Sequence, residues 1–203
     1  MGVKERKERQ KVEMRDLILN AAHDLFLTKG FDQVSIRNIA DEIEYSPATI
    51  YLYFKDKNDL FLALHDMSFK AFNQFIVDIF KIKDPFKRLT ALGERYIDFA
   101  LEHPQYYEMM FIIHAPMLCD ANKDQWPEGS KALDAVEYLM GECKKVGHFK
   151  GQDVKVLAFL AWSHMHGICS LILRDRLKIY DEKIRESIRT KSFKLFINML
   201  SKL

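Results

Sequence analysis

The sequence predicts an all-α protein with an N-terminal three-helix unit and a larger C-terminal helical domain. Apolar residues recur at helical spacing in almost every segment, and no segment shows the alternation that is typical of a strand. N-cap residues precede several of these segments. With 203 residues, 48% of them hydrophobic, the chain can bury a core in one domain or two small ones. We expect two domains, residues 1–60 and 61–203.

The first helix has an apolar stripe and ends at a glycine. Its stripe consists of Met14, Ile18, Ala22, Leu25 and Phe26. Gly30 follows Lys29, and glycine there can take the left-handed conformation that ends a helix. Six basic and three acidic residues lie between Met1 and Arg15. We expect a mobile basic arm here, and the alternative is a solvated extension of the first helix.

Two short helices follow, each with its own N-cap. Ser35 precedes residues 36–43, and Ser46 precedes a third helix of about two turns with Pro47 at its first position. Asp56, with Asp59 three residues later, caps a fourth helix that begins at residue 57. A long helix, a short helix, a tight turn and another short helix form the layout of a helix-turn-helix.

Polar and aromatic groups gather at the end of the third helix and around it. Phenol, hydroxyl and ammonium groups there can donate to phosphate oxygens, and the guanidinium of Arg37 suits guanine O6 and N7. An ion pair with Asp41 is the alternative for Arg37. A structural bundle without a DNA site is the alternative for the whole unit, because aromatic clusters usually mean core. The candidate DNA-binding residues are Arg37, Pro47, Ala48, Thr49, Tyr51, Tyr53, Lys55 and Lys57.

This part of the chain resembles the DNA-binding signature of TetR-type transcriptional regulators. The resemblance rests on residues 30–31, 34–40 and 49–60 and spans about residues 12–61. It implies phosphate contacts by Thr49, Tyr51, Tyr53 and Lys57, a base contact by Arg37, and groove contacts by Pro47 and Ala48. It also implies that the basic arm lies along phosphates or enters the minor groove.

Three residues depart from the TetR pattern. Tyr53 stands where many members have histidine, Leu52 where many have an aromatic residue, and Lys55 where proline or a small residue is common. The first departure changes which hydrogen bond reaches the DNA backbone, and it does not remove the ability to form one.

The remainder of the chain is expected to form six helices. Their expected ranges are 57–83, 86–102, 105–117, 131–146, 153–177 and 181–203, with a polar loop at 119–130. The last two have apolar faces that can pack against a second copy as a four-helix bundle. The resemblance likewise implies a homodimer that reads a palindrome. Trp162, His166 and Gly167 resemble the pattern of one group of TetR C-terminal domains, and a core tryptophan beside a glycine that admits another helix is the alternative.

The resemblance implies a small ligand inside the C-terminal domain. Aromatic and methionine side chains suit an apolar or aromatic molecule, although the same residues also form plain cores. A ligand that shifts the far end of the fourth helix would move the third helix at its near end. The candidate ligand-binding residues are Phe72, Phe75, Tyr96, Phe99, Tyr106, Met109, Met110, His114, Tyr138, Trp162 and His166.

We therefore expect a repressor that a small ligand releases from a palindromic operator. The alternative is an architectural or protein-recruiting DNA-binding factor without a ligand. No GxSxG, P-loop, GxGxxG or HExxH motif occurs, so an enzyme is not expected. His164 and His166 point to different sides of a helix, and the three cysteines are far apart, so no metal or cofactor is expected. The charged N-terminus and the expected lack of a stretch of about 20 apolar residues predict a cytoplasmic protein without a membrane partner.

Overall fold

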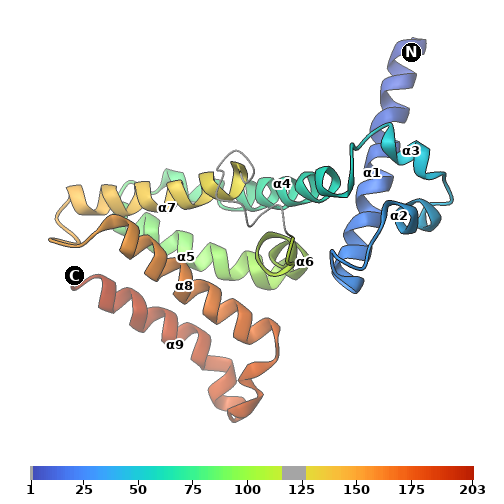
Figure 1. Ribbon diagram of the computed structural model, residues 1–203. Coiled ribbons are helices and arrows are strands. Elements are labelled where there is room, and N and C mark those ends of the chain that lie inside the picture. The colour runs from blue at the N-terminus through green and yellow to red at the C-terminus, as the bar shows by residue number, and fades with distance from the viewer. Residues whose placement is uncertain (1, 116–126) are drawn as a thin grey trace. The chain divides into compact units, whose positions relative to one another are not determined.

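The structure is a computed structural model that describes residues 2–115 and 127–203, and over these residues it contains helices and no strand (Figure 1). The all-α prediction is confirmed. The α-helices are α1 (Val3–Lys29), α2 (Ile36–Glu42), α3 (Pro47–Tyr51), α4 (Lys57–Phe75), α5 (Pro85–Glu102), α6 (Pro104–Tyr107), α7 (Pro127–Lys145), α8 (Val154–Leu173) and α9 (Glu182–Leu200). Two 3-10 helices, Val77–Lys81 and Arg176–Ile179, and a π-helix, Glu108–Ile112, complete the set for the described chain.

Contacts divide the described residues into two compact units. Unit 1 comprises residues 2–69 and 105–115, and unit 2 comprises residues 70–104 and 127–203. Helix α4 is continuous and has residues in both units. This grouping places the first turns of α4 and the segment 105–115 with α1, α2 and α3, whereas the sequence predicts a boundary after residue 60.

Unit 1 is built around a cluster of phenylalanine rings. The ring centroids of Phe26 and Phe31 lie 5.5 Å apart, those of Phe26 and Phe61 5.5 Å, and those of Phe31 and Phe61 5.2 Å. All three side chains are buried in one hydrophobic cluster, which Met109 and Ala115 of the second segment join. The end of α1, the loop after it and the start of α4 therefore share one core.

His65 of α4 is a buried polar residue that the sequence analysis did not single out. Its side chain is 1% exposed and lies between the rings of Phe61 and Phe69. Burial disfavours the charged imidazolium and lowers the pKa of His65 to about 4, against an opposing hydrogen bond with the backbone of Met110. The imidazole is therefore neutral at physiological pH.

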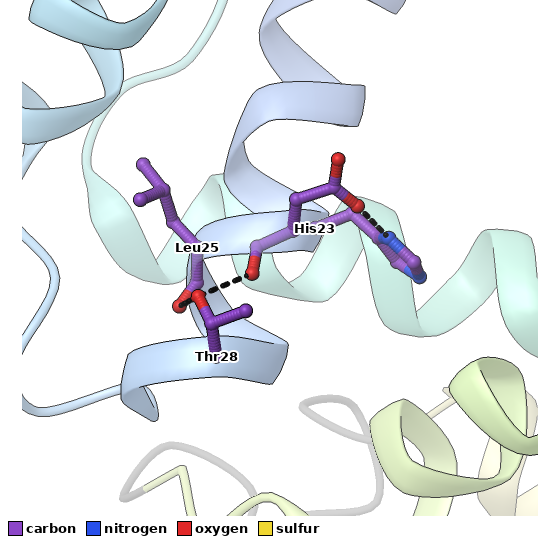
Figure 2. A network of polar contacts seen from close by, with 4 residues as sticks. His23, Leu25 and Thr28 are labelled. Carbon is purple, nitrogen blue, oxygen red and sulfur yellow. Dashed lines mark hydrogen bonds and ion pairs between the residues drawn. The ribbon is translucent and has the colours of Figure 1, made fainter.

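The end of α1 is held by side-chain contacts to its own last turns (Figure 2). The hydroxyl of Thr28 donates to the carbonyl oxygens of Asp24, at 2.8 Å, and Leu25, at 3.3 Å. His23 Nδ1 lies 3.1 Å from Asp24 Oδ1. Gly30 then ends the helix, as predicted, with φ 80° and ψ 160°. Only glycine adopts this region readily, although it is not the left-handed helical region that the sequence suggests.

Unit 2 is a bundle in which α5, α7 and α8 pack against one another (Figure 1). Gly93 of α5 permits a close approach, because a Cβ there would lie 2.9 Å from Phe193 of α9 and 3.3 Å from the sulfur of Met165 of α8. His164 of α8 stacks on Phe196 of α9 with ring centroids 4.1 Å apart. Helix α9 is thus packed on the bundle through its phenylalanines.

Several predicted boundaries are wrong. The N-terminal residues are helical from Val3, so the extension of the first helix is correct and the mobile arm is not. The fourth helix ends at Phe75, and a 3-10 turn follows instead of a continuous helix to residue 83. The single helix expected at 105–117 is the short α6 followed by a π-helix that ends at Ile112, and residues 116 and 117 lie outside the described residues.

The last helices begin and end elsewhere than expected. Helix α7 begins at Pro127, inside the expected polar loop, whose residues 119–126 lie outside the described part of the chain. Helix α8 ends at Leu173, and α9 spans Glu182–Leu200 instead of 181–203. The starts of α8 and α9 lie within one residue of the expected ones, whereas the start of α7 and the end of α8 lie four residues from theirs.

Helix α8 corrects the expectation that no stretch approaches the length of a membrane span. Its 20 residues are long enough and apolar enough to cross a membrane by length and composition. Lys155 is the single charged residue among them, counting Asp, Glu, Lys and Arg. A packing helix of a soluble protein meets the same criterion, so this property is weak evidence for a membrane.

Candidate nucleic-acid interface

Serine side chains cap the starts of α2 and α3, and the cap of α2 is reciprocal. The backbone N–H of Asn38 donates to Ser35 Oγ at 3.2 Å, and the backbone N–H of Ser35 donates to Asn38 Oδ1 at 2.9 Å. The backbone N–H of Thr49 donates to Ser46 Oγ at 3.3 Å. Both predicted N-caps are confirmed. Pro47 occupies the first turn of α3, as predicted.

The turn between α2 and α3 contains a residue with a left-handed backbone. Glu44 has φ 59°. This conformation lets the backbone N–H of Tyr45 donate to the carbonyl of Ala40 at 2.9 Å, which closes the end of α2. A side chain with a Cβ is strained here by roughly 1 to 2 kcal/mol relative to the right-handed region. The tight turn between α2 and α3 therefore forms with conformational strain in the backbone of Glu44.

Helices α2 and α3 bury one face and expose the other. Ile39 and Ile50 are fully buried at 0% exposure. Arg37, Pro47 and Ala48 are exposed. The alternative for Arg37, an ion pair with Asp41, is absent from the part of the chain that the structure describes. The guanidinium is thus available to a partner.

The three rings at the end of α3 differ in burial. Tyr51 is 56% exposed, Tyr53 is half-buried against the unit 1 core, and Phe54 is 3% exposed. The guanidinium carbon of Arg15 lies 5.1 Å from the centroid of the Phe54 ring. Core packing therefore explains Phe54 and part of Tyr53, and it does not explain Tyr51. The hydroxyl of Thr49, a half-buried residue, lies 3.1 Å from Ser46 Oγ.

The start of α4 is held by two aspartates and a lysine. The backbone N–H of Asp59 donates to Asp56 Oδ1 at 2.9 Å, and that of Lys55 donates to Asp59 Oδ2 at 2.9 Å. Lys57 Nζ donates to the carbonyl of Phe31 at 2.9 Å and lies 4.1 Å from the centroid of its ring. Local sequence did not predict this internal contact, because the two residues are 26 apart. Lys55 is exposed.

Five of the candidate ligand-binding residues lie together in unit 2. The ring centroid of Phe72 lies 5.8 Å from that of Tyr96 and 5.1 Å from that of Phe99. The Tyr96 hydroxyl is 3.5 Å from His166 Nδ1, and the rings of Trp162 and His166 are 6.4 Å apart. Burial lowers the pKa of His166, which favours its neutral form. Phe72 and Phe99 are buried, as in a plain core.

Phe75 joins this group, and the other ligand candidates lie elsewhere. Phe75 packs against Phe99 in unit 2 with centroids 5.5 Å apart, and Tyr138 on α7 is 61% exposed. The remaining candidates, Tyr106, Met109, Met110 and His114, belong to unit 1. Met109 and Met110 are buried there. The fold therefore brings together six of the candidates, which we call the aromatic cluster of unit 2: Phe72, Phe75, Tyr96, Phe99, Trp162 and His166.

Two family descriptions match this chain. Residues 18–64 match "Bacterial regulatory proteins, tetR family", and residues 89–191 match "Tetracyclin repressor-like, C-terminal domain". The first match contains α2 and α3 and the turn between them. The second contains α5, α7 and α8.

Curated relatives are bacterial transcriptional regulators. An HTH-type transcriptional regulator of Staphylococcus aureus is 31% identical over 93 residues, which cover 45% of this chain and 48% of that protein. The HTH-type transcriptional repressor NicS of Pseudomonas putida is 29% identical over 97 residues, 47% of this chain and 46% of that protein. The chain thus spans about half the length of the curated relatives it matches.

Solved structures share the fold over nearly the whole chain. AibR in complex with isovaleryl coenzyme A and operator DNA has a TM-score of 0.67 and 17% identity, with 92% of this chain and 97% of that chain covered. The transcriptional regulator FadR of Bacillus subtilis in complex with stearoyl-CoA has a TM-score of 0.67 and 17% identity, with 91% and 96% covered. At this identity the likeness concerns the fold.

The strained turn supports a stability prediction. Replacing Glu44 by glycine relieves the left-handed strain and adds flexibility to the unfolded chain, so Glu44→Gly should stabilise the protein by about 0.5 to 1 kcal/mol. The matched control is Glu42→Gly, which places the same substitution in α2 and should destabilise by about 1 kcal/mol. Thermal unfolding at one protein concentration distinguishes the two. Equal destabilisation by both variants would show that the turn is not strained at residue 44.

Proposed function

The chain belongs to the TetR family of bacterial regulatory proteins, and from this we propose that it is a cytoplasmic repressor that binds a palindromic operator as a homodimer. The observation that carries the proposal is the exposed face of α2 and α3, which contains Arg37, Pro47, Ala48 and Tyr51, while Ile39 and Ile50 hold both helices on the core. A short helix whose outer face is free in this way fits a major groove.

We assign base contacts to one of the candidate residues and phosphate contacts to the others. In the described part of the chain Arg37 does not form the alternative ion pair with Asp41, so its planar guanidinium can bind guanine in bidentate fashion. Tyr51 and Thr49 carry hydroxyls that can donate to phosphate oxygens, with Tyr53 half-buried beside them. Lys55 is an exposed cation. Lys57 has one of its three N–H groups engaged by Phe31, which leaves two for a phosphate.

The operator contacts are tested by two substitutions with different expected signatures. Arg37→Ala should cost about 1 to 3 kcal/mol and relax specificity at one position of each half-site. Lys55→Gln should weaken binding to all sequences alike and reduce the salt slope by about 1. Selection of duplexes from a random pool followed by titration at several salt concentrations measures both. If Arg37→Ala weakened selected and unrelated duplexes equally, Arg37 would not read a base.

The homodimer proposal rests on apolar side chains of unit 2 that are exposed to solvent. On α8, Val156, Phe159, Leu160 and Leu171 are 66%, 65%, 46% and 50% exposed, and their spacing places them on one face. Gly167 falls on the same face and has nothing within 4 Å of an added Cβ. On α9 the exposed apolar residues are Ile184, Leu195 and Met199. These faces suit a four-helix bundle made with a second copy.

A charge placed in this apolar face should separate the subunits. Phe159→Glu leaves a carboxylate unpaired in the buried centre of the proposed interface, so sedimentation should show the 23.9 kDa monomer at micromolar concentration. The control is Val146→Glu, at a residue that is 60% exposed beyond the end of α7 and should leave the dimer intact. A wild-type chain that sediments as a monomer would contradict the proposal.

We also propose that a small ligand bound at the aromatic cluster of unit 2 weakens operator binding. Half-buried Tyr96, Trp162 and His166 combine aromatic surface with hydrogen-bonding groups, as ligand sites do. Two proteins of this fold hold acyl-CoA ligands, so a thioester with an apolar chain is the first class to test, ahead of other apolar or aromatic molecules.

Isovaleryl-CoA and stearoyl-CoA are the probes for this proposal, with free coenzyme A as the control. Binding is measured by native mass spectrometry, and an active ligand should lower operator affinity between about 5-fold and 150-fold. Trp162→Ala should reduce ligand binding, whereas Phe80→Ala, at a ring that is 56% exposed in the Val77–Lys81 helix, should not. A ligand that binds tightly and leaves operator affinity unchanged would favour the ligand-independent architectural factor.

A further inference from the structure

Two surfaces of α8 that the proposed function uses meet at Phe159. Trp162 and His166, the α8 members of the aromatic cluster, follow Phe159 by three and seven residues. At 3.6 residues per turn, Phe159 lies about 60° from Trp162 and about 20° from His166 around the helix axis. The exposed apolar face of α8 also contains Phe159, together with Val156. One side chain therefore belongs both to the face proposed for the dimer and to the side that carries the ligand candidates.

The aromatic cluster is covered on the side of α5 and open toward Phe159. On the covered side the Tyr96 hydroxyl lies 3.5 Å from His166 Nδ1, and the Phe99 ring is buried. Trp162 and His166 are only half-buried, and Phe159 beside them is 65% exposed. Ligand sites in proteins bury most of the surface of their ligand. A ligand held at this cluster would stay in contact with water along α8 unless a further surface covers that edge.

The surface around Phe159 fits a second copy of this chain. Exposed apolar residues continue along α8 to Leu171 and across to Leu195 on α9, which packs beside α8. The α8 part of this surface contains no charged residue, and a large apolar patch is rarely left exposed on a monomer. Gly167 has open space above it, so a partner helix can approach closely there. A two-fold interface pairs a surface with itself, and an uncharged apolar face meets that requirement.

We propose that the partner subunit closes the aromatic cluster at Phe159, so that the ligand site is complete only in the homodimer. This inference rests on the homodimer and the ligand site proposed above, and it adds a coupling between them. Packing of Phe159 against the partner subunit shields Trp162 and His166 from water. By linkage, a ligand that binds the closed site tightens the dimer by the factor by which the dimer tightens ligand binding. Release from the operator then occurs without separation of the subunits.

Trp162 reports on this closure through its fluorescence. The chain has two tryptophans, and Trp126→Phe gives a parent protein in which Trp162 is the only one. In this parent, Leu195→Glu places an unpaired carboxylate in the proposed interface from α9, leaves α8 unchanged and should give a monomer. Thr190→Glu is the matched control, because it adds the same charge at an exposed position about 140° around α9 from Leu195. Acrylamide quenching then measures how open the Trp162 ring is to solvent.

The quenching constant of Trp162 should be about twofold larger in the Leu195→Glu monomer than in the Thr190→Glu dimer, because an interface excludes water and quencher from the ring. Dilution of the parent through its monomer–dimer transition should give the same rise without a further substitution. Stearoyl-CoA is the ligand probe, and the control should bind it between about 5-fold and 150-fold more tightly than the monomeric variant. Circular dichroism checks that both variants keep their helices. The quenching result decides the inference without any ligand.

Three results would overturn the closure while leaving the proposed function intact. Equal quenching of Trp162 in the monomer and the dimer would show that the partner subunit does not cover this ring. Equal affinity of the two variants for stearoyl-CoA would show that one subunit forms the whole site. Separation of the parent dimer by stearoyl-CoA would show a coupling of the opposite sign. A parent that sediments as a monomer at every concentration would overturn this inference and the proposed homodimer together.

Discussion

The packing of Phe26, Phe31 and Phe61 is the constraint on which the DNA-facing surface depends. Helices α2 and α3 have seven and five residues, which is too short for a helix to be stable alone in water. They persist because Ile39 and Ile50 are buried against the core that these rings build. The exposed face of α3 is therefore held in place by tertiary packing, and the helix propensity of its own residues contributes little.

Lys57 links this core to the candidate DNA contacts. Its ammonium donates to the carbonyl of Phe31 and lies over the ring of the same residue, so it ties the start of α4 to the loop before α2. A cation placed there also stands next to Lys55 and the end of α3. Lys57 thus combines a structural role with a proposed phosphate contact, and loss of operator binding in a Lys57 variant alone would not separate the two roles. The exposed Lys55 avoids this ambiguity.

Local patterns were sufficient to predict the helix-turn-helix, because its signals lie within a few residues of one another. Ser35, Ser46 and Asp56 each cap a helix that begins where the sequence indicates. The unusual backbone of Glu44 was not predicted, since glutamate carries no signal for a left-handed turn. The charged residues at the start of the chain have no apolar residues at helical spacing, and they therefore predict a mobile arm. The structure has a helix there, because a helix that is anchored at one end propagates through such residues.

Features that depend on residues distant in sequence were beyond these patterns. The burial of His65 depends on packing with Phe69 and on the backbone of Met110, 45 positions away. The same limit applies to the ligand candidates, because aromatic residues at helical spacing look alike whether they line a site or fill a core. The structure gathers Tyr96, Trp162 and His166, which come from α5 and α8, and no local signal marks that pairing.

The proposed two-fold homodimer would explain both the shortness of α3 and the exposed apolar face of α8. A five-residue helix contacts few base pairs, so specificity requires two copies in successive major grooves, about 34 to 36 Å apart. The proposed pairing would also cover Phe159 and Leu160, which are exposed in the single chain. Base contacts specify the site and phosphate contacts position the protein on it.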